Sequence, residues 1–383
     1  MKGPFLIYFV SFFSFLTLIL SWNYSYPQDH PIVSPFRKAD KIVFGCLLPL
    51  GGEYELVGKR ALRGVLTATD LFYSGSNLQV VVKDTGSDPN KIRKSLEEMV
   101  TEEEVSFVIG PIESASVDSA SEGAESLRVP TVVFPLSERI SPDNRYIIKF
   151  SYSVEKQSEV LAAYAVQEIG IKTFGILHPK TRLGELFKDS FVKSIRRSGG
   201  EVTYIGSYDS KLTDISSEFE WIKSIQPAAL FIPDGASRSG ELIMRLKQHV
   251  TLGNLLFLGP NTWNSEAFLR TVGGQADGII FRVLFTDYFF TGAQEWIDFR
   301  DRFKSLYNNE EPGFLEYQVY EAVRLILSVL KTPIETREEI MERLKVEGNN
   351  QLFSIIQDAN GSLEISPKPL ILTVKQGYIL KIK

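Results

Sequence analysis

The stretch SFVIGPIESASVDSASEGAESLRVPTVVFPLSER, residues Ser106 to Arg139, decides the fold of the chain. It holds two short apolar runs, Ser106 to Ile109 and Thr131 to Phe134, and each is soon closed by a proline. Such runs are typical of buried parallel strands. The residues between them carry apolar side chains at helical spacing on one narrow face: Val117, Ala120, Ala124 and Leu127.

A strand, a helix and a second parallel strand are joined by a right-handed crossover, so both strands end at the same edge of the sheet. Open α/β sheets bind ligands at that edge. The two loops that leave it, Gly110 to Ser116 and Pro135 to Arg139, are therefore predicted to line a binding site.

Length and composition narrow the class of protein. A chain of 383 residues is long enough for two lobes. The net charge is −5, with acids and bases intermixed, which gives no basic stripe for a nucleic-acid partner. The single cysteine, Cys46, lies in an apolar run, so it forms no disulfide within the chain and belongs to no zinc cluster.

The N-terminus gives the clue to the compartment. Lys2 is followed by the uncharged apolar run Pro4 to Trp22, which is long enough to span nearly the core of a bilayer. Residues 1–23 are read as a signal peptide, or as an anchor that associates the protein with a membrane. Residues 24–40, which contain several prolines and no periodicity, are read as a linker. We therefore expect a periplasmic or other extracytoplasmic protein, either secreted or anchored.

From residue 41 onward, apolar runs and amphipathic segments alternate. Strands are predicted at 41–50, 78–83, 106–109, 131–134, 173–177, 202–208, 228–232 and 255–258, with crossing strands at 147–152 and 278–284 and short strands within 351–382. Helices are predicted at 59–73, 90–103, 117–127, 156–169, 185–197, 213–225, 237–249, 293–307 and 315–331.

This order predicts an α/β protein of two doubly wound parallel-sheet lobes joined by a hinge of several crossing strands. Lobe one is assigned to residues 41–149 and 285–335, and lobe two to residues 150–284 and 336–383. Two lobes joined by several crossings form a hinge architecture that is suited to closing on a ligand.

Four segments resemble the type I periplasmic binding proteins of the Leu/Ile/Val-binding branch, which serve ABC transporters. They are Ile42 to Gly64, Val105 to Ser114, Phe174 to Phe187 and Gly313 to Ala322. The resemblance covers nearly everything after the leader. The run Leu256 to Phe281 is more similar to a sub-branch that contains penicillin-binding-protein activator lipoproteins.

The resemblance implies a solute-binding protein with two lobes that hold an amino acid or a related small polar molecule between strand-end loops. Carried over by position, it implicates residues of lobe one: Tyr54, Ser114, Pro135, Leu136 and Ser137. Glu113, beside Ser114, is added on its own chemistry as a partner for a cationic ligand group. From lobe two the resemblance implicates a second set: Leu183, Asp234, Gly235 and Asn261. Leu183 stands where many relatives have tyrosine. Where an acid often binds the ligand's amine, this chain has the uncharged Asn261 or Thr262. The implied partner is an ABC transporter permease, or, in the activator-like sub-branch, a membrane or cell-wall enzyme.

Each of these positions also has a plainer interpretation. Ser114 and Ser116 begin a helix, where free N–H groups favour an anion and where a serine also serves as a cap. Glu113 is suited to a cationic ligand group or to the positive end of the helix. Asp234 and Gly235 line the site or simply form a tight turn.

Catalysis has little support in the sequence. His178 stands at a strand end, but no nucleophile elbow accompanies it, so a hydrolase is the weakest hypothesis and no catalytic residue is assigned. No metal-ligand spacing, GxGxxG motif or P-loop occurs, so no metal or cofactor is expected. Trp263 and Tyr288 are expected to pack in the core.

Overall fold

The computed structural model describes residues 41–72, 77–86, 88–113, 116–134, 144–150, 152–209, 215–249, 255–273, 282–357 and 361–383. Everything below concerns these residues. The predicted leader and linker, residues 1–40, lie outside them, as do four of the expected binding residues: Ser114, Pro135, Leu136 and Ser137.

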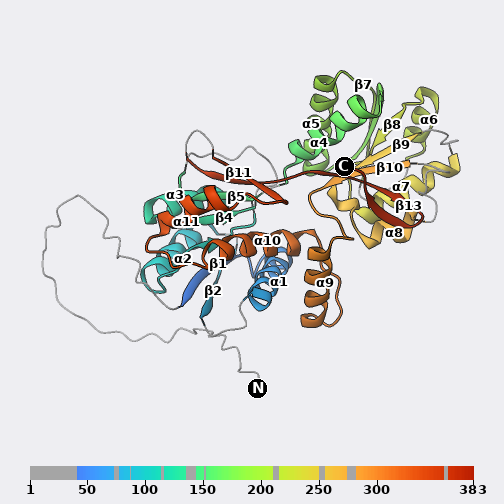
Figure 1. Cartoon of the computed structure of the whole chain (residues 1–383). Helices are drawn as coiled ribbons and strands as arrows, with labels where there is room; N and C mark the ends of the chain where they lie inside the picture. Colours follow the sequence, from blue (N-terminus) through green and yellow to red (C-terminus); the bar gives the residue numbers. More distant parts are fainter. Residues whose placement is uncertain are drawn as a thin grey trace, which may run out of the picture. The chain divides into compact units, whose positions relative to one another are not determined.

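Lobe one is built on a seven-stranded sheet in the order β11-β12-β5-β4-β3-β1-β2 (Figure 1). Its strands are β1 (Ile42–Leu48), β2 (Leu78–Asp84), β3 (Val108–Ile109), β4 (Thr131–Val133), β5 (Ile147–Phe150), β11 (Phe353–Gln357) and β12 (Leu363–Pro367). All neighbours are parallel except the β11-β12 pair, which is antiparallel.

Lobe two has a second seven-stranded sheet, in the order β14-β13-β10-β9-β8-β6-β7. Its strands are β6 (Thr173–Pro179), β7 (Glu201–Tyr208), β8 (Ala229–Phe231), β9 (Leu256–Gly259), β10 (Arg282–Asp287), β13 (Leu370–Lys375) and β14 (Tyr378–Lys381). The strands from β6 to β10 are parallel, and β13 and β14 add an antiparallel edge.

The two sheets share the topology of their first five strands and differ at the added edge, where β12 is parallel to β5 but β13 is antiparallel to β10. In each, the first strand of the lobe lies between the second and the third, so the strand order reverses direction at β1/β3 and at β6/β8. The two lobes are therefore repeats of one doubly wound pattern, with two late strands added at one edge of each. Such reversal points are where open α/β sheets bind ligands.

Helices cover both faces of each sheet because the buried strands present apolar residues on both sides. In lobe one these are α1 (Glu55–Phe72), α9 (Gln294–Leu306), α10 (Phe314–Val329) and α11 (Arg337–Glu347) on one face, with α2 (Pro89–Thr101) and α3 (Val117–Leu127) on the other. In lobe two, α4 (Val154–Ala163), the π-helical segment η2 (Tyr164–Glu168) and α5 (Arg182–Ser198) cover one face. The opposite face is covered by α6 (Ser216–Ile225), α7 (Ala236–His249) and α8 (Glu266–Val272), and the short 3-10 turn η3 (Asn261–Trp263) precedes α8.

Three boundaries differ from the sequence prediction. Residues 337–367, expected in lobe two, form α11, β11 and β12 of lobe one, because β12 pairs in parallel with β5. Only β13 and β14 return to lobe two. The predicted crossing strand 147–152 is instead β5, a member of the first sheet, and the chain returns to lobe one after Asp287 rather than within 278–284.

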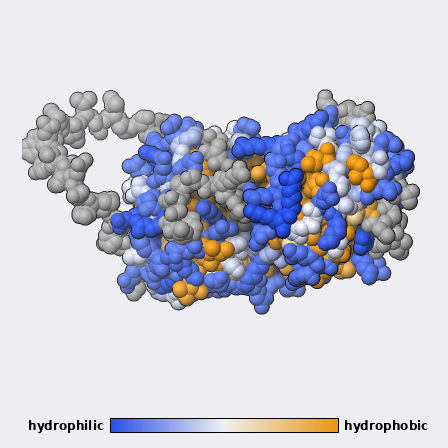
Figure 2. All heavy atoms as spheres, turned by 90° about the horizontal axis from the view of Figure 1, so that it is seen from above, coloured by the Kyte–Doolittle hydropathy of each residue, from blue (hydrophilic) through white to orange (hydrophobic). Residues whose placement is uncertain are grey.

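The face of the molecule in Figure 2 is mostly hydrophilic, with the larger group of apolar residues over lobe two, at the right, and smaller groups at the lower left. No helix in the described part of the chain is both long enough and apolar enough to cross a bilayer. Cys46 is buried inside β1, and burial raises the pKa of its thiol.

Candidate functional site

The candidate site consists of the loops at the carboxyl ends of the strands that flank the two reversal points. In lobe one these loops follow β1 and β3, and in lobe two they follow β6 and β8. Of the expected residues within the described part, Tyr54 follows β1, Glu113 follows β3, Leu183 follows β6, and Asp234 and Gly235 follow β8. The topology thus brings these residues to corresponding edges of the two sheets.

The loop after β1 is held by Asp84 at the end of β2. One oxygen of Asp84, Oδ1, accepts hydrogen bonds from the backbone N–H groups of Leu50 (2.7 Å), Gly51 (3.2 Å) and Gly86 (2.9 Å). Because three backbone donors converge on one carboxylate oxygen, the ends of β1 and β2 form a single rigid platform.

In both lobes, the helix that follows the first strand lies very close to the end of that strand. In lobe one, a Cβ added to Gly58 would stand 2.1 Å from the carbonyl oxygen of Pro49, just after β1. In lobe two, a Cβ added to Gly184 would stand 2.2 Å from the carbonyl oxygen of Pro179, at the end of β6. Glycine is required at both positions because α1 and α5 approach the preceding strand end this closely.

These close approaches present apolar side chains at the start of each helix. Tyr54, just before α1, is 39% exposed, and Leu183, in the first turn of α5, is 43% exposed. Leu56 in the first turn of α1 is also exposed. Exposed apolar side chains at the rims of both candidate sites would lose contact with water if the lobes closed on a ligand.

Glu113 has the most unusual environment in the candidate site. The residue is only 8% exposed, and Oε1 of its carboxylate accepts a hydrogen bond from the Ser116 hydroxyl at 2.8 Å. The other oxygen, Oε2, is buried and has no hydrogen-bond partner within the described residues. A buried carboxylate oxygen without a donor is costly, so Oε2 is suited to a hydrogen-bond donor that the described residues do not supply.

The structure does not support the simpler interpretation of Ser116 as a helix cap. It occupies the position before α3, but its side chain makes no capping hydrogen bond to the helix backbone. Its hydroxyl donates to Glu113 instead, and the backbone N–H of Ser116 donates to the carbonyl of Glu113 at 3.0 Å. The serine orients the glutamate and does not cap the helix.

In lobe two, Asp234 is the centre of a polar cluster at the end of β8. Its Oδ2 accepts a hydrogen bond from the Tyr208 hydroxyl at 2.7 Å and lies 3.5 Å from the Arg238 guanidinium. Its Oδ1 accepts from the backbone N–H of Gly235 at 2.7 Å, and its carbonyl accepts from the Thr262 hydroxyl at 2.8 Å. Burial, with the carboxylate of Asp234 beside it, raises the pKa of Tyr208.

Asp234 thus has protein partners for both oxygens, which supports a structural role in the turn. Gly235 has open space around the position of an added Cβ and an ordinary backbone φ, so the turn does not require glycine there. Asn261 is buried after β9, and its backbone N–H donates to the Gln157 side chain of α4 at 3.0 Å.

Two cations of lobe two were not singled out from the sequence. Lys180 and Arg182 directly follow β6 and are exposed, and their side chains have no hydrogen bond or ion pair within the described residues. The signal that could have found them is their place in the run HPKTRLG, right after a strand that flanks the reversal point. Free guanidinium and ammonium groups at such an edge are suited to a carboxylate.

The remaining candidates are structural. His178 is buried in β6, and its Nδ1 lies 3.1 Å from the Pro179 carbonyl. Trp263 is fully buried and stacks on Phe268, with ring centroids 4.5 Å apart, as expected for a core residue. Tyr288 is likewise buried in the core of lobe one, which confirms the expectation.

Two lobes whose first five strands have the same topology, with polar and apolar groups at corresponding strand ends, define the class of two-lobed binding proteins. A family model described as periplasmic binding protein matches residues 41–348, and the chain belongs to this family. Membership of a periplasmic binding protein family implies an extracytoplasmic location. The family is one of substrate-binding proteins rather than of enzymes.

A curated relative, the Leu/Ile/Val-binding protein homolog 3 of Brucella melitensis, is 23% identical over 250 residues. The match covers 63% of this chain and 66% of the relative, slightly less than two thirds of its length.

Solved structures share the fold at low sequence identity. A putative branched-chain amino acid ABC transporter protein from Rhodospirillum rubrum is 18% identical with a TM-score of 0.73, covering 89% of this chain and 100% of its own. A substrate-binding protein of a branched-chain amino acid transporter from Streptococcus pneumoniae, in complex with isoleucine, is 18% identical with a TM-score of 0.62, at 89% and 100% coverage. A solute-binding protein from Rhodopseudomonas palustris, in complex with 3,4-dihydroxybenzoic acid, is 17% identical with a TM-score of 0.64, at 90% and 97% coverage.

Proposed function

We propose that this protein is an extracytoplasmic solute-binding protein that closes its two lobes on a small polar ligand and delivers it to an ABC transporter permease. The ligand would lie between the loops after β1 and β3 of lobe one and those after β6 and β8 of lobe two. The proposed binding set is still the ten residues expected from the sequence, nine carried over by position and Glu113 added on its chemistry, and four of the ten lie outside the described residues.

The buried, unpartnered oxygen of Glu113 carries this proposal. A ligand N–H or ammonium group would supply the missing donor, and a hydrogen bond to a charged group is worth about 1.5–3 kcal/mol. A ligand carboxylate would be bound by Lys180 or Arg182 of lobe two. An amino acid or a close relative has both an amine and a carboxylate. It would therefore bind to Glu113 of lobe one and to Lys180 or Arg182 of lobe two at the same time.

This assignment separates two kinds of ligand that the structural neighbours contain. The Streptococcus pneumoniae protein holds isoleucine, which has an amine, and the Rhodopseudomonas palustris protein holds an aromatic acid, which has none. Glu113 favours a ligand that bears an amine, because an ammonium group gives Oε2 a charged donor, whereas the hydroxyls of the dihydroxybenzoic acid offer only neutral ones.

Titration calorimetry with a matched ligand pair tests the proposal. Isoleucine and 3-methylpentanoate differ only in the amine, so a site completed by Glu113 should bind isoleucine at least about tenfold more tightly. Other amino acids are compared with their deaminated acids in the same way. If the deaminated acids bind as tightly as the amino acids, Glu113 does not receive a ligand amine.

The second candidate function is a regulatory interaction module, either free of ligand or sensing one, that contacts a membrane or cell-wall enzyme. It is favoured by the resemblance of Leu256 to Phe281 to the activator lipoproteins and by the apolar segment Pro4 to Trp22, which would hold the protein at the membrane. Affinity capture from membranes distinguishes the two. Recovery of a cell-wall enzyme, unaffected by Ser114→Ala with Ser137→Ala, favours the module, whereas recovery of permeases alone excludes it.

A further inference from the structure

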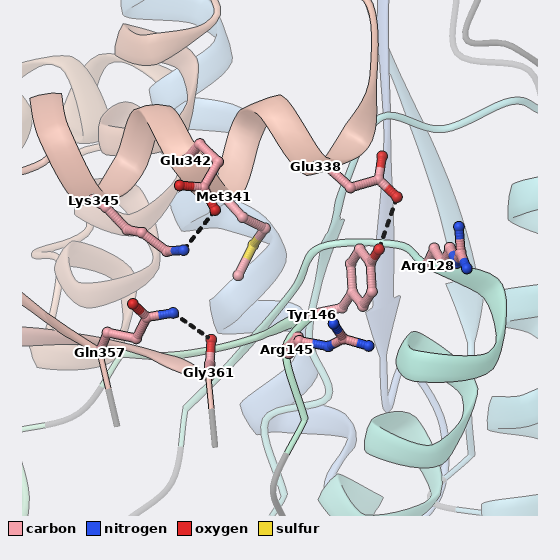
Figure 3. A pocket seen from close by; sticks show the side chains of 9 residues that line it. All are labelled: Arg128, Arg145, Tyr146, Glu338, Met341, Glu342, Lys345, Gln357 and Gly361. Carbon is pink, nitrogen blue, oxygen red and sulfur yellow. Dashed lines mark hydrogen bonds and ion pairs between the residues drawn. The ribbon is translucent and has the colours of Figure 1, made fainter. Parts of the chain in front are cut away.

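A cavity lies in lobe one, at the edge of the sheet opposite the loops of the candidate site. It has a volume of about 330 Å³ and is lined by nine residues from four segments (Figure 3). They are Arg128 at the end of α3, Arg145 and Tyr146 just before β5, Glu338, Met341, Glu342 and Lys345 of α11, and Gln357 and Gly361 of the β11-β12 hairpin. Because residues 145 and 146 precede a parallel strand, this is the amino-terminal edge of the sheet.

The cavity has an apolar floor. Tyr146 and Met341 are buried, and the Met341 thioether lies between the two polar ends of the cavity in Figure 3. A volume of this size is near the lower end of small-molecule sites, so it fits a compact ligand rather than a folded partner.

The carboxylates that line the cavity already have protein donors. The Tyr146 hydroxyl donates to Glu338 at 2.7 Å, and the Lys345 ammonium pairs with Glu342 at 2.6 Å. Burial first, and the hydrogen bond to Glu338 second, raise the pKa of Tyr146 to about 12, so the tyrosine stays a donor near neutral pH. Neither carboxylate therefore calls for a cationic ligand.

The guanidinium groups of Arg128 and Arg145, in contrast, have N–H donors that make no strong hydrogen bond within the described residues. Arg128 makes no side-chain hydrogen bond or ion pair within the described residues, and it is exposed. Arg145 has one side-chain partner there, Glu125 at 3.6 Å, which is too long for a strong hydrogen bond. Figure 3 shows both side chains beside the ring of Tyr146, on the same side of the cavity.

The backbone of Arg128 adds a second observation. Arg128 ends α3 in the left-handed conformation, with φ 50° and ψ 49°, where glycine is usually found. A side chain at such a position costs free energy. A guanidinium kept at a strained position, without a protein partner and beside a cavity, is consistent with a role in binding.

We propose that this cavity binds a small organic carboxylate, with its carboxylate between the guanidinium groups of Arg128 and Arg145 and its apolar body over Met341. Guanidinium groups suit a carboxylate because their N–H donors match its two oxygens in one plane. The site is independent of the strand-end site, so it would be occupied whether or not the proposed transport function holds.

The chain carries a local probe for this test. It has four methionines, of which Met341 lies in the cavity, Met99 in a core of lobe one and Met244 in lobe two. In the full chain labelled at the methionine methyl groups, benzoate should shift the Met341 signal saturably and leave those of Met99 and Met244 in place. The Met341→Leu variant assigns the signal. Benzamide, which has the same shape but no charge, should not shift it.

The variant Arg128→Gln with Arg145→Gln should weaken benzoate binding at Met341 by at least about tenfold, because charge-assisted bonds are lost. The control Arg93→Gln with Arg300→Gln removes two paired guanidinium groups elsewhere in lobe one and should leave the affinity unchanged. Glu113→Gln should also leave it unchanged, which separates this site from the strand-end site. An unsaturable Met341 shift, an equal response to benzamide, or unaltered binding in the double arginine variant would each overturn the proposal.

Discussion

At the scale of single residues, two buried carboxyl groups differ in how many of their oxygens have a hydrogen-bond partner. Glu113 has one oxygen held by Ser116 and the other without a partner within the described residues. Asp287, at the crossing from lobe two to lobe one, is completely buried and receives hydrogen bonds from the Asn264 amide at 3.0 Å and the Tyr288 backbone N–H at 2.8 Å. The first is suited to a ligand, and the second stabilises the crossing.

Replacing Glu113 should change the stability of the protein and its affinity for a ligand in opposite directions. Glu113→Gln removes a buried charge, so the free energy of unfolding without ligand should rise by about 1 kcal/mol, while the affinity for an amino-acid ligand should fall about tenfold or more. Denaturant unfolding and calorimetry measure the two effects. The control is Glu122→Gln, which changes an exposed glutamate of α3 paired with Arg93. Equal effects in both variants would contradict the role given to Glu113.

Asp287 should make stability depend on pH. Burial, only partly offset by its hydrogen bonds, raises the pKa of Asp287 in the folded protein, so folding binds a proton above the ordinary aspartate pKa of about 4. Its contribution is fully present below the unfolded pKa and is lost as pH rises through the folded pKa, by up to about 1.4 kcal/mol per pH unit. The stability difference between the wild type and Asp287→Asn, followed against pH, should show this slope. A difference that stays constant above pH 4 contradicts the assigned protonation.

The residues of the site were predictable to different degrees. The sequence placed Glu113 and Tyr54 at strand ends of lobe one because their loops follow clear apolar runs. It left open whether Glu113 serves the helix or a ligand, since the decisive fact, one unpartnered oxygen, depends on packing among distant segments. Lys180 and Arg182 were missed because an exposed cation after a strand looks like any surface charge.

At the scale of elements, the contact between a strand end and the next helix can be tested with a matched glycine pair. In Gly184→Ala, the new methyl group would collide with the Pro179 carbonyl, and we expect a loss of about 2 kcal/mol in the free energy of unfolding. In Gly235→Ala the added methyl meets open space, so the change should stay within about 0.5 kcal/mol. Denaturant unfolding of both variants checks this. Similar losses would show that α5 does not need its close approach to β6.

The end of α3 offers a second test at this scale. Arg128→Gly should raise the free energy of unfolding by about 1 kcal/mol, because glycine adopts the left-handed conformation without a steric penalty. Arg128→Ala removes the guanidinium but keeps the penalty, so it should bring no gain. If alanine stabilises as much as glycine, charge rather than backbone conformation governs the stability of this helix end.

The order of elements was largely predictable, and lobe membership was not. Apolar runs and helical periodicity located the strands from β1 to β9 because each lies in a stretch of one clear period. The strands β11 and β12 were assigned to the wrong lobe, since their short sequences carry no mark of the sheet they join. Their place is decided by parallel pairing of Leu363 with Ile148, a contact between residues far apart in the chain.

At the scale of the whole molecule, three chain crossings connect the lobes: β5 to α4, β10 to α9, and β12 to β13. Such connections allow hinge closure around a ligand. We expect the radius of gyration of the full chain, measured by solution X-ray scattering, to fall saturably when an amino-acid ligand binds. Isoleucine and 3-methylpentanoate form the matched pair for this experiment. An unchanged radius at saturation would show that binding occurs without closure.

The central claim, that the protein binds a small amine-bearing solute through Glu113, is tested most directly by thermal unfolding of the full chain against a panel of amino acids. A true ligand at 100 times its Kd should add about 2.7 kcal/mol to the free energy of unfolding. We predict such stabilisation by at least one amino acid, and a fall to about 1.4 kcal/mol or less at the same concentration in Glu113→Gln, because its affinity is about tenfold lower or weaker still. Stabilisation by no amino acid, or equal stabilisation of wild type and variant, would contradict the claim.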